Sequence, residues 1–290
     1  MLYSLYIIGF YLIKIMPLRA SYFVSDLAAN IYYLFAKKDR ENLAENLKIV
    51  LGPDADDKKI EKCIRGIFIN FARYLVDFFK FTEFTQDFIS RKAEFVGIEN
   101  LDKCLSEGKG AIALTPHLGN WELGAALIAA KGYPLTAIVL EHKDKRIDDF
   151  FTRQRRINNL KLVPLGMQVK QCFGFLKNNE ILAIAGDKDY TSTGDQAEFF
   201  GKTAFIPKGP AVFSLRTGAP IIVTTCVRKK DDSFVIRFEE PIRYKPTGDE
   251  EKDIRALMGE YLAKFENRIR EHPDQWYAFQ KIWNQGLIIR

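Results

Sequence analysis

Cysteine and histidine are scarce in this chain of 290 residues, which has four cysteines and three histidines. The cysteines, at positions 63, 104, 172 and 226, lie far apart and form no CxxC pair. A chain of this length can bury a full core and does not need disulfides. We therefore expect reduced thiols in a protein that faces the cytosol, and no metal site built from cysteines.

Long apolar runs are also missing, since no stretch offers the ~20 unbroken apolar residues of a confident membrane span. The first 36 residues come nearest, but Lys14, Pro17 and Arg19 interrupt them. No basic residue precedes the first apolar run and no clear cleavage site follows it, which argues against a secretory signal peptide. Their aromatic content and the basic residues at 37–40 favour a helical hairpin or interfacial membrane anchor over a buried core helix.

Several catalytic and nucleotide-binding motifs are absent. The sequence contains no GxSxG and no HExxH. "GKGAIA" at 108–113 precedes its expected strand, whereas a dinucleotide-binding motif follows one. "GKT" at 201–203 lacks the earlier glycine that a phosphate-binding P-loop requires.

The net charge of +6 is the main compositional signal that remains. A basic surface suits an acidic partner, such as anionic lipid, a phosphorylated substrate, an acidic protein or nucleic acid. Solubility alone would also explain this charge, so it does not choose among these partners.

Hydrophobic periodicity predicts helices first and then an alternation of strands and helices. Residues 40–51 and 57–81 have helical spacing, and the first of these segments ends at Gly52-Pro53. From about residue 94, short apolar strands alternate with helices, which indicates βαβ units. The expected strands lie at 94–97, 111–115, 135–141, 160–165 and 180–186, and the helices between them at 98–108, 119–131, 144–158 and 168–178.

The remaining third of the chain begins with a predicted long loop at 187–207 and a helix near 208–217. Two β-rich runs, 220–227 and 233–242, flank a polar turn and predict an antiparallel hairpin, before a helix at 249–271. We expect an α/β fold with a mostly parallel mixed sheet flanked by helices. The expected division is a membrane-anchoring segment at 1–39, a helical layer at 40–90 and an α/β core at 91–290.

The stretch "TPHLGNWELG", residues 115–124, joins an apolar strand to an apolar helix. Residues five apart on one helix do not face each other, so His117 fits the strand end and Glu122 the first helical turn. The carboxylate could then orient the imidazole, which would act as a general base on an alcohol. A buried histidine bonded to a backbone carbonyl, with Glu122 solvated, explains the spacing equally well.

Two further groups of polar residues lie near this joint. Six basic residues between positions 143 and 156, Arg155 and Arg156 among them, suit a phosphate or carboxylate clamp, although a solvated helix face is the commoner fate of such a run. Asp187 and Asp189 follow a predicted strand, so they should lie at the carboxyl edge of the sheet, where ligands bind. Two carboxylates are few for a metal, which favours a structural or substrate-ordering role.

Four blocks of sequence, in order, resemble those of the bacterial lipid A late acyltransferases, within the lysophospholipid acyltransferase superfamily. "RENLAENLKIVLG" and "TPHLGNWELG" resemble the first two blocks, the latter with the HxxxxE motif at 117–122. "GDKDYTSTGDQAEFFGKTAFIPKGPAVFSLRTGAPII" and "HPDQWYAFQKIW" resemble the last two. The chain departs from the family in the middle of its DxD block, where Lys188 replaces the more usual glutamine or histidine, and in lacking the glycine that typically follows the arginine block.

The resemblance implies transfer of a fatty acyl chain from a thioester, typically on acyl carrier protein, to a hydroxyl of a lipid A precursor. His117 would be the general base and Glu122 its orienting partner. Arg155 or Arg156 would hold the donor or stabilise negative charge, and Glu141 matches a further acidic position of related enzymes. Asp187 and Asp189 would help to bind substrate. Neither a metal nor a cofactor is implied, and the expected location is the cytoplasmic face of a bacterial inner membrane.

Other functions remain open from the sequence. The same chemistry could serve a different phosphoglycolipid, aminolipid or lysophospholipid acceptor. A non-catalytic, membrane-bound basic protein that recruits nucleic acid or anionic lipid would not need His117 or Glu122. A metal-dependent hydrolase could instead use His117, Asp187 and Asp189.

Overall fold

Four helices open the chain in the computed structural model, which describes residues 2–156, 160–190 and 194–283. They are α1 (Leu2–Ile15), α2 (Leu18–Phe35), α3 (Lys37–Leu51) and α4 (Asp57–Lys80). The helices predicted at 40–51 and 57–81 are thereby confirmed. Asp56 caps α4 by accepting a hydrogen bond from the backbone N–H of Lys58. Within the described ranges, no helix has the length and apolarity needed to cross a bilayer.

A seven-stranded mixed sheet follows, with the strand order β1-β9-β8-β2-β5-β3-β4. Strands β2, β3, β4, β5 and β8 run parallel to one another. Strand β9 pairs antiparallel with β8, and β1 pairs parallel with β9 at the edge of the sheet. The predicted mostly parallel sheet and the predicted β8–β9 hairpin are confirmed. The strand bounds are β1 (Ala93–Val96), β2 (Ala111–Thr115), β3 (Leu135–Val139), β4 (Lys161–Pro164), β5 (Ile181–Ala185), β8 (Ile221–Arg228) and β9 (Phe234–Phe238).

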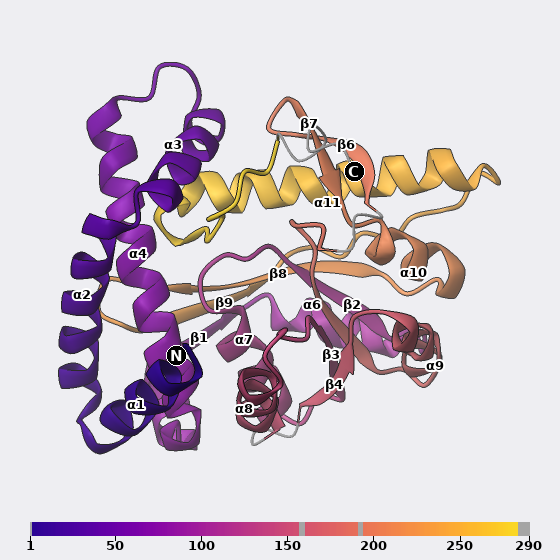
Figure 1. Cartoon of the computed structure of the whole chain (residues 1–290). Coiled ribbons are helices and arrows are strands. Elements are labelled where there is room, and N and C mark those ends of the chain that lie inside the picture. Colours follow the sequence, from indigo (N-terminus) through magenta and orange to yellow (C-terminus); the bar gives the residue numbers. More distant parts are fainter. Residues whose placement is uncertain (1, 157–159, 191–193, 284–290) are drawn as a thin grey trace.

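Helices cover both faces of this sheet, as a parallel sheet buried on two sides requires. One face carries α6 (Ile98–Ser106), α7 (Trp121–Ala130) and α8 (Lys145–Arg156), and the other carries α9 (Cys172–Lys177), α10 (Gly209–Thr217) and α11 (Glu250–Glu271). Figure 1 shows α11 above the sheet and α7 and α8 below it. Each face has its own apolar core. A short helix, α5 (Gln86–Lys92), and three 3₁₀ turns (Phe81–Glu83, Met167–Gln171 and Pro273–Gln275) complete the helical elements in the described ranges.

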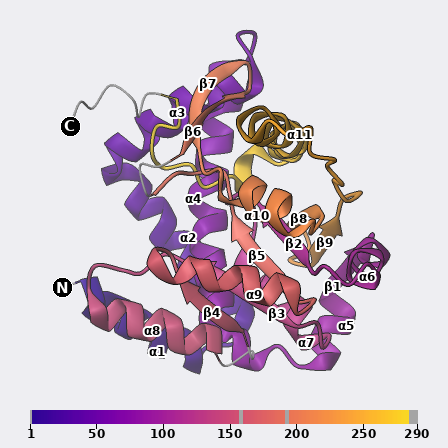
Figure 2. The ribbon, with the colours of Figure 1, turned by 90° about the vertical axis from the view of Figure 1, so that its right-hand side faces the viewer.

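The N-terminal helices stand together at one side of the sheet (Figures 1 and 2). Helix α2 packs along α4 and buries Tyr22, Ala29 and Tyr33, so it belongs to the helical layer that was predicted to begin only at residue 40. Its Asp26 accepts two hydrogen bonds from the Arg73 guanidinium. The opposite face of the α1–α2 pair exposes large apolar side chains: Leu5, Ile8, Tyr11, Leu12, Ile15, Phe23, Val24, Leu27, Ile31, Tyr32, Leu34 and Phe35.

The prediction of a long loop at 187–207 is partly wrong. This segment contains an antiparallel hairpin of β6 (Asp195–Phe199) and β7 (Lys202–Ile206). Its strands carry charged and amide side chains, and this polar composition hides them from a search for apolar alternation. Phe200 and Gly201 make the turn with φ of +53° and +70°. Residues 191–193 lie outside the described residues, as do the last two residues of the helix predicted at 144–158.

Candidate active site

His117 and Asp187 meet at the carboxyl edge of the sheet. Strands β2 and β5 are parallel neighbours in which Thr115 pairs with Ala185, and each of the two side chains follows its strand by two residues. The imidazole Nδ1 lies 2.5 Å from Asp187 Oδ1. The backbone N–H of His117 donates to the same oxygen at 3.0 Å. Two segments 70 residues apart in sequence thus form one histidine–carboxylate pair.

Asp187 is fully buried and charged. Burial raises the pKa of its carboxyl, but the imidazole of His117, Lys188 and the indole of Trp276 outweigh that effect, so that the pKa lies well below its ordinary value. Trp276 Nε1 donates to Asp187 Oδ2 at 2.9 Å. An ionised carboxylate can only accept, so His117 Nδ1 carries the hydrogen and Nε2 is the basic ring nitrogen.

Glu122 does not fill the orienting role predicted for it, because its carboxylate binds Arg155. The Arg155 guanidinium donates from Nε to both carboxylate oxygens at 3.0 and 3.1 Å, and from a terminal nitrogen to Oε1 at 2.6 Å. Both side chains are about nine-tenths buried. The HxxxxE spacing therefore joins α7 to α8 through a buried ion pair, and Asp187 takes the place beside the imidazole.

The turn that carries His117 into α7 has two local determinants. Gly119 has φ of +64°, and a Cβ there would lie 2.1 Å from the carbonyl oxygen of Cys226. Asn120 caps α7 by accepting a hydrogen bond from Leu123 N, and its amide donates to Asp77 Oδ2 at 2.7 Å. Asp77 is fully buried on α4 and forms an ion pair with Arg228 of β8. The active-site turn is thus held by contacts with α4 and β8.

The C-terminal segment 273–278 packs against the backbone of the turn that carries His117. Leu118 and Trp276 form an antiparallel bridge, and the backbone N–H of Tyr277 donates to the His117 carbonyl at 3.0 Å. The side chain of Gln275 exchanges two hydrogen bonds with the backbone of Arg228. Sequence reasoning used this segment only as a family block, and nothing in its spacing indicated a contact with His117.

A cavity of about 850 Å³ opens onto these residues. His117, Glu122, Arg155, Lys188 and Asp189 line it, among aromatic and aliphatic side chains such as Tyr6, Phe71, Tyr74, Trp121, Leu140, Phe151, Leu162, Phe213 and Tyr277. A pocket of this size and apolar lining suits a lipid chain as well as a small molecule.

Not every predicted substrate-binding residue reaches the cavity. Glu141 is exposed in the loop after β3, where its neighbours Leu140 and His142 line the cavity instead. Arg156 is exposed at the end of α8, whereas Arg155 is buried. Asp189 accepts a hydrogen bond from Gly194 N at 2.7 Å. Over the residues that the structure describes, no set of three or more histidine, cysteine or acidic side chains is grouped to bind a metal.

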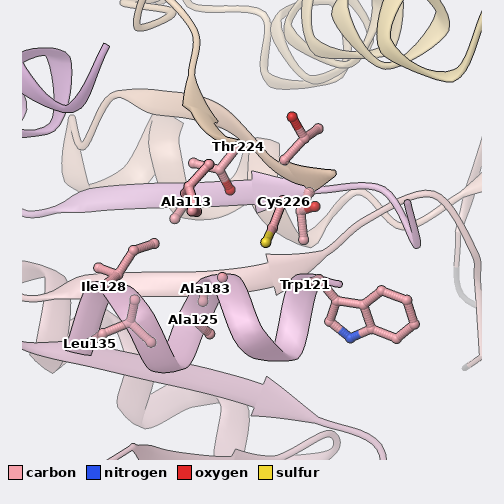
Figure 3. Close-up of a pocket in the computed structure, with 12 residues that line it drawn as sticks. Ala113, Trp121, Ala125, Ile128, Leu135, Ala183, Thr224 and Cys226 are labelled. Atoms are coloured by element: carbon pink, nitrogen blue, oxygen red, sulfur yellow. The ribbon is translucent and has the colours of Figure 1, made fainter. Parts of the chain in front are cut away.

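A second, smaller cavity of about 30 Å³ lies between α7 and the sheet (Figure 3). Small side chains make room for it, including Ala113, Ala125 and Ala183, and Ile128 and Leu135 also line it. Four residues, Thr115, Trp121, Ala125 and Ala183, line both cavities. The two cavities therefore lie next to each other at the start of α7.

Comparison with known proteins gives the class to which this fold and site belong. The sequence profile of the bacterial lipid A biosynthesis acyltransferases matches residues 1–285. The chain is 25% identical to the phosphatidylinositol mannoside acyltransferase of Mycolicibacterium smegmatis, over 97% of this chain and 91% of that protein. It is 26% identical to the enzyme of that name from Mycobacterium tuberculosis, over 85% and 78%.

A more distant relative is the lipid A biosynthesis acyltransferase of Haemophilus influenzae, 22% identical over 57% of this chain and 52% of that protein. The chain belongs to the bacterial lipid A biosynthesis acyltransferase family. It is an acyltransferase, and the resemblance inferred from the four sequence blocks is confirmed.

Proposed function

We propose that the protein moves a fatty acyl chain from a thioester to a hydroxyl of a membrane glycolipid, with His117 as general base and Asp187 as its orienting partner. The observation that carries this proposal is the His117–Asp187 pair, whose histidine lines a large, mostly apolar cavity. The imidazole presents Nε2 to a hydroxyl, and the cavity offers the apolar surface that an acyl chain needs.

The reaction needs one proton acceptor and no change of oxidation state. His117 Nε2 takes the proton of the acceptor hydroxyl as its oxygen attacks the thioester carbon. The carbonyl oxygen becomes an oxyanion, and the carbonyl then re-forms as the carbon–sulfur bond breaks and its electron pair leaves with sulfur. The imidazolium returns the proton to the thiolate. Asp187 stabilises the imidazolium in between, because its charge lies against Nδ1.

The donor and acceptor that we propose are acyl carrier protein thioester and a lipid A precursor. The +6 net charge suits an acidic carrier protein and a phosphorylated lipid. A second acceptor has support of its own, since the two mycobacterial relatives, similar over most of this chain, are named for phosphatidylinositol mannosides. We place the reaction at the cytoplasmic face of the bacterial inner membrane.

The test supplies both acceptors in parallel. Purified protein is given dodecanoyl or hexadecanoyl thioesters of acyl carrier protein or coenzyme A, with a lipid A precursor or a phosphatidylinositol mannoside, and acylated lipid is followed by mass spectrometry. The His117→Ala variant should lose activity about 10²–10⁴-fold while still folding. Near-normal turnover by that variant with either acceptor would refute the role of His117.

A further inference from the structure

The cavity is lined by cationic side chains that the proton-transfer chemistry does not use, and among the described residues one of them has no ion-pair partner. Three cations line it: Arg155, Lys188 and Lys208. Arg155 is paired with Glu122, and Lys208 lies 3.1 Å from Asp195. Lys188 forms no ion pair with another described residue. Its Nζ instead donates to the backbone carbonyl of Tyr277 at 2.7 Å.

The position of Lys188 follows from that of Asp187. It is the next residue along the chain after β5, at the sheet edge that carries His117. An ammonium has three N–H donors, and the bond to Tyr277 uses one. The carboxylate of Asp187, the preceding residue, is already engaged by His117 and Trp276. The remaining charge and hydrogen-bonding capacity of Lys188 are therefore available to a ligand in the cavity.

We infer that Lys188 is a catalytic residue that stabilises the oxyanion of the thioester carbonyl, an inference that rests on the proposed acyl transfer. Acyl transfer places a full negative charge on that oxygen, and a positive group in a water-poor site stabilises it strongly. Burial lowers the pKa of Lys188, which the charge of Asp187 only partly offsets. The ammonium thus lies in an environment of low polarity, where its field on the substrate is stronger than in water.

This chemistry is balanced without further reactants. The hydroxyl oxygen forms a bond to the carbonyl carbon, its proton goes to His117, and the carbonyl electrons move onto oxygen beside Lys188. When the carbonyl re-forms, the electron pair of the carbon–sulfur bond leaves with sulfur, and His117 protonates the thiolate. Lys188 keeps its protons throughout and contributes only charge and hydrogen bonds.

Three substitutions separate charge from structure. Lys188→Arg keeps the charge, Lys188→Gln keeps a neutral donor for the Tyr277 carbonyl, and Lys188→Met keeps neither. We expect kcat to fall in that order, with a loss of about 10²–10³-fold for Lys188→Met and little change in the KM of either substrate. Lys161→Met is the matched control, because that lysine pairs with Glu180 at the surface and lies outside the cavity.

The kinetic pattern decides between a role on the oxyanion and a role in binding. A higher acceptor or donor KM with kcat preserved would place Lys188 on a substrate's anionic group and overturn the inference. Unchanged kinetics in Lys188→Gln, with unchanged thermal stability, would also overturn it. Loss of activity in His117→Ala alongside full activity in the Lys188 variants would leave the proposed acyl transfer intact and remove only Lys188.

Discussion

At the scale of single residues, Asp187 orients the imidazole of His117 through its contact with Nδ1. The Asp187→Asn variant keeps the shape of the side chain but loses the negative charge beside Nδ1, and an amide that donates there would favour the wrong imidazole tautomer. We expect kcat to fall about 10²–10⁴-fold with little change in substrate KM. Steady-state kinetics checks this, with circular dichroism to confirm that the variant folds.

The same carboxyl should give the protein an acid-sensitive stability. Its pKa in the folded state is lower than in the unfolded chain, so it stabilises the fold above the unfolded pKa of about 3.9 and loses that contribution as pH falls towards the folded pKa. Urea midpoints measured from pH 5 downward should therefore drop less in Asp187→Asn than in the wild type. Parallel pH dependence in the two proteins would argue against the depressed pKa.

Glu122 and Arg155 should behave as a structural pair. Breaking a buried ion pair leaves one charge uncompensated and costs about 3–5 kcal/mol, whereas replacing both partners with apolar residues is often close to neutral. We expect Glu122→Gln to lower the melting temperature more than a Glu122→Leu/Arg155→Met double variant does. A double-mutant cycle with Arg155→Met measures the coupling, and additive effects would show that the contact contributes little.

At the scale of elements, the start of α7 depends on a conformation that only glycine adopts easily. A positive φ costs an L residue about 1–2 kcal/mol, and the Cβ of an alanine at 119 would also collide with the Cys226 carbonyl. Gly119→Ala should lower both thermal stability and kcat, because the turn places His117. Gly259→Ala, inside α11 with nothing within 4 Å of the added Cβ, should instead stabilise by about 0.5–1 kcal/mol and leave kcat unchanged.

Elements could be predicted well where the apolar period was clear. Helix α4 and strands β2, β5 and β8 are apolar at the expected spacing and lie within a few residues of their predicted bounds. Strands β6 and β7 escaped prediction because their pairing depends on each other and on α11, with no apolar alternation of their own. Periodic spacing of apolar residues reveals a strand or helix that buries one face, and a hairpin with many polar residues shows little of this spacing.

At the scale of the whole molecule, the α1–α2 pair combines a packed face and an exposed apolar face. Tyr22 and Tyr33 lie in the interior, whereas Phe23 and Leu27 are 71% and 54% exposed. We propose that this outer face rests on the membrane. Because Tyr22 and Tyr33 are buried, removing residues 1–39 would disturb the fold. A substitution on the exposed face is the cleaner test of membrane contact.

A Phe23→Glu/Leu27→Glu variant should lose liposome binding while keeping its melting temperature. Apolar insertion persists at high salt, unlike electrostatic attraction of a basic protein to anionic lipid, so binding is measured by flotation at low and high salt. Leu34→Glu on the same exposed surface should add to the loss. Full binding of the double variant at high salt would exclude this face as the membrane contact.

The sequence by itself determined the alternation of strands and helices, the carboxyl-edge positions of His117 and Asp187, and the family. Only the tertiary structure decided which carboxylate meets the imidazole. Glu122, five residues away, turns to Arg155 on α8, and Asp187 reaches His117 because β5 lies beside β2 in the sheet. The spacing of residues within a helix fixes the direction in which each side chain points from that helix. The order of parallel strands depends instead on how helices pack on both faces of the whole sheet.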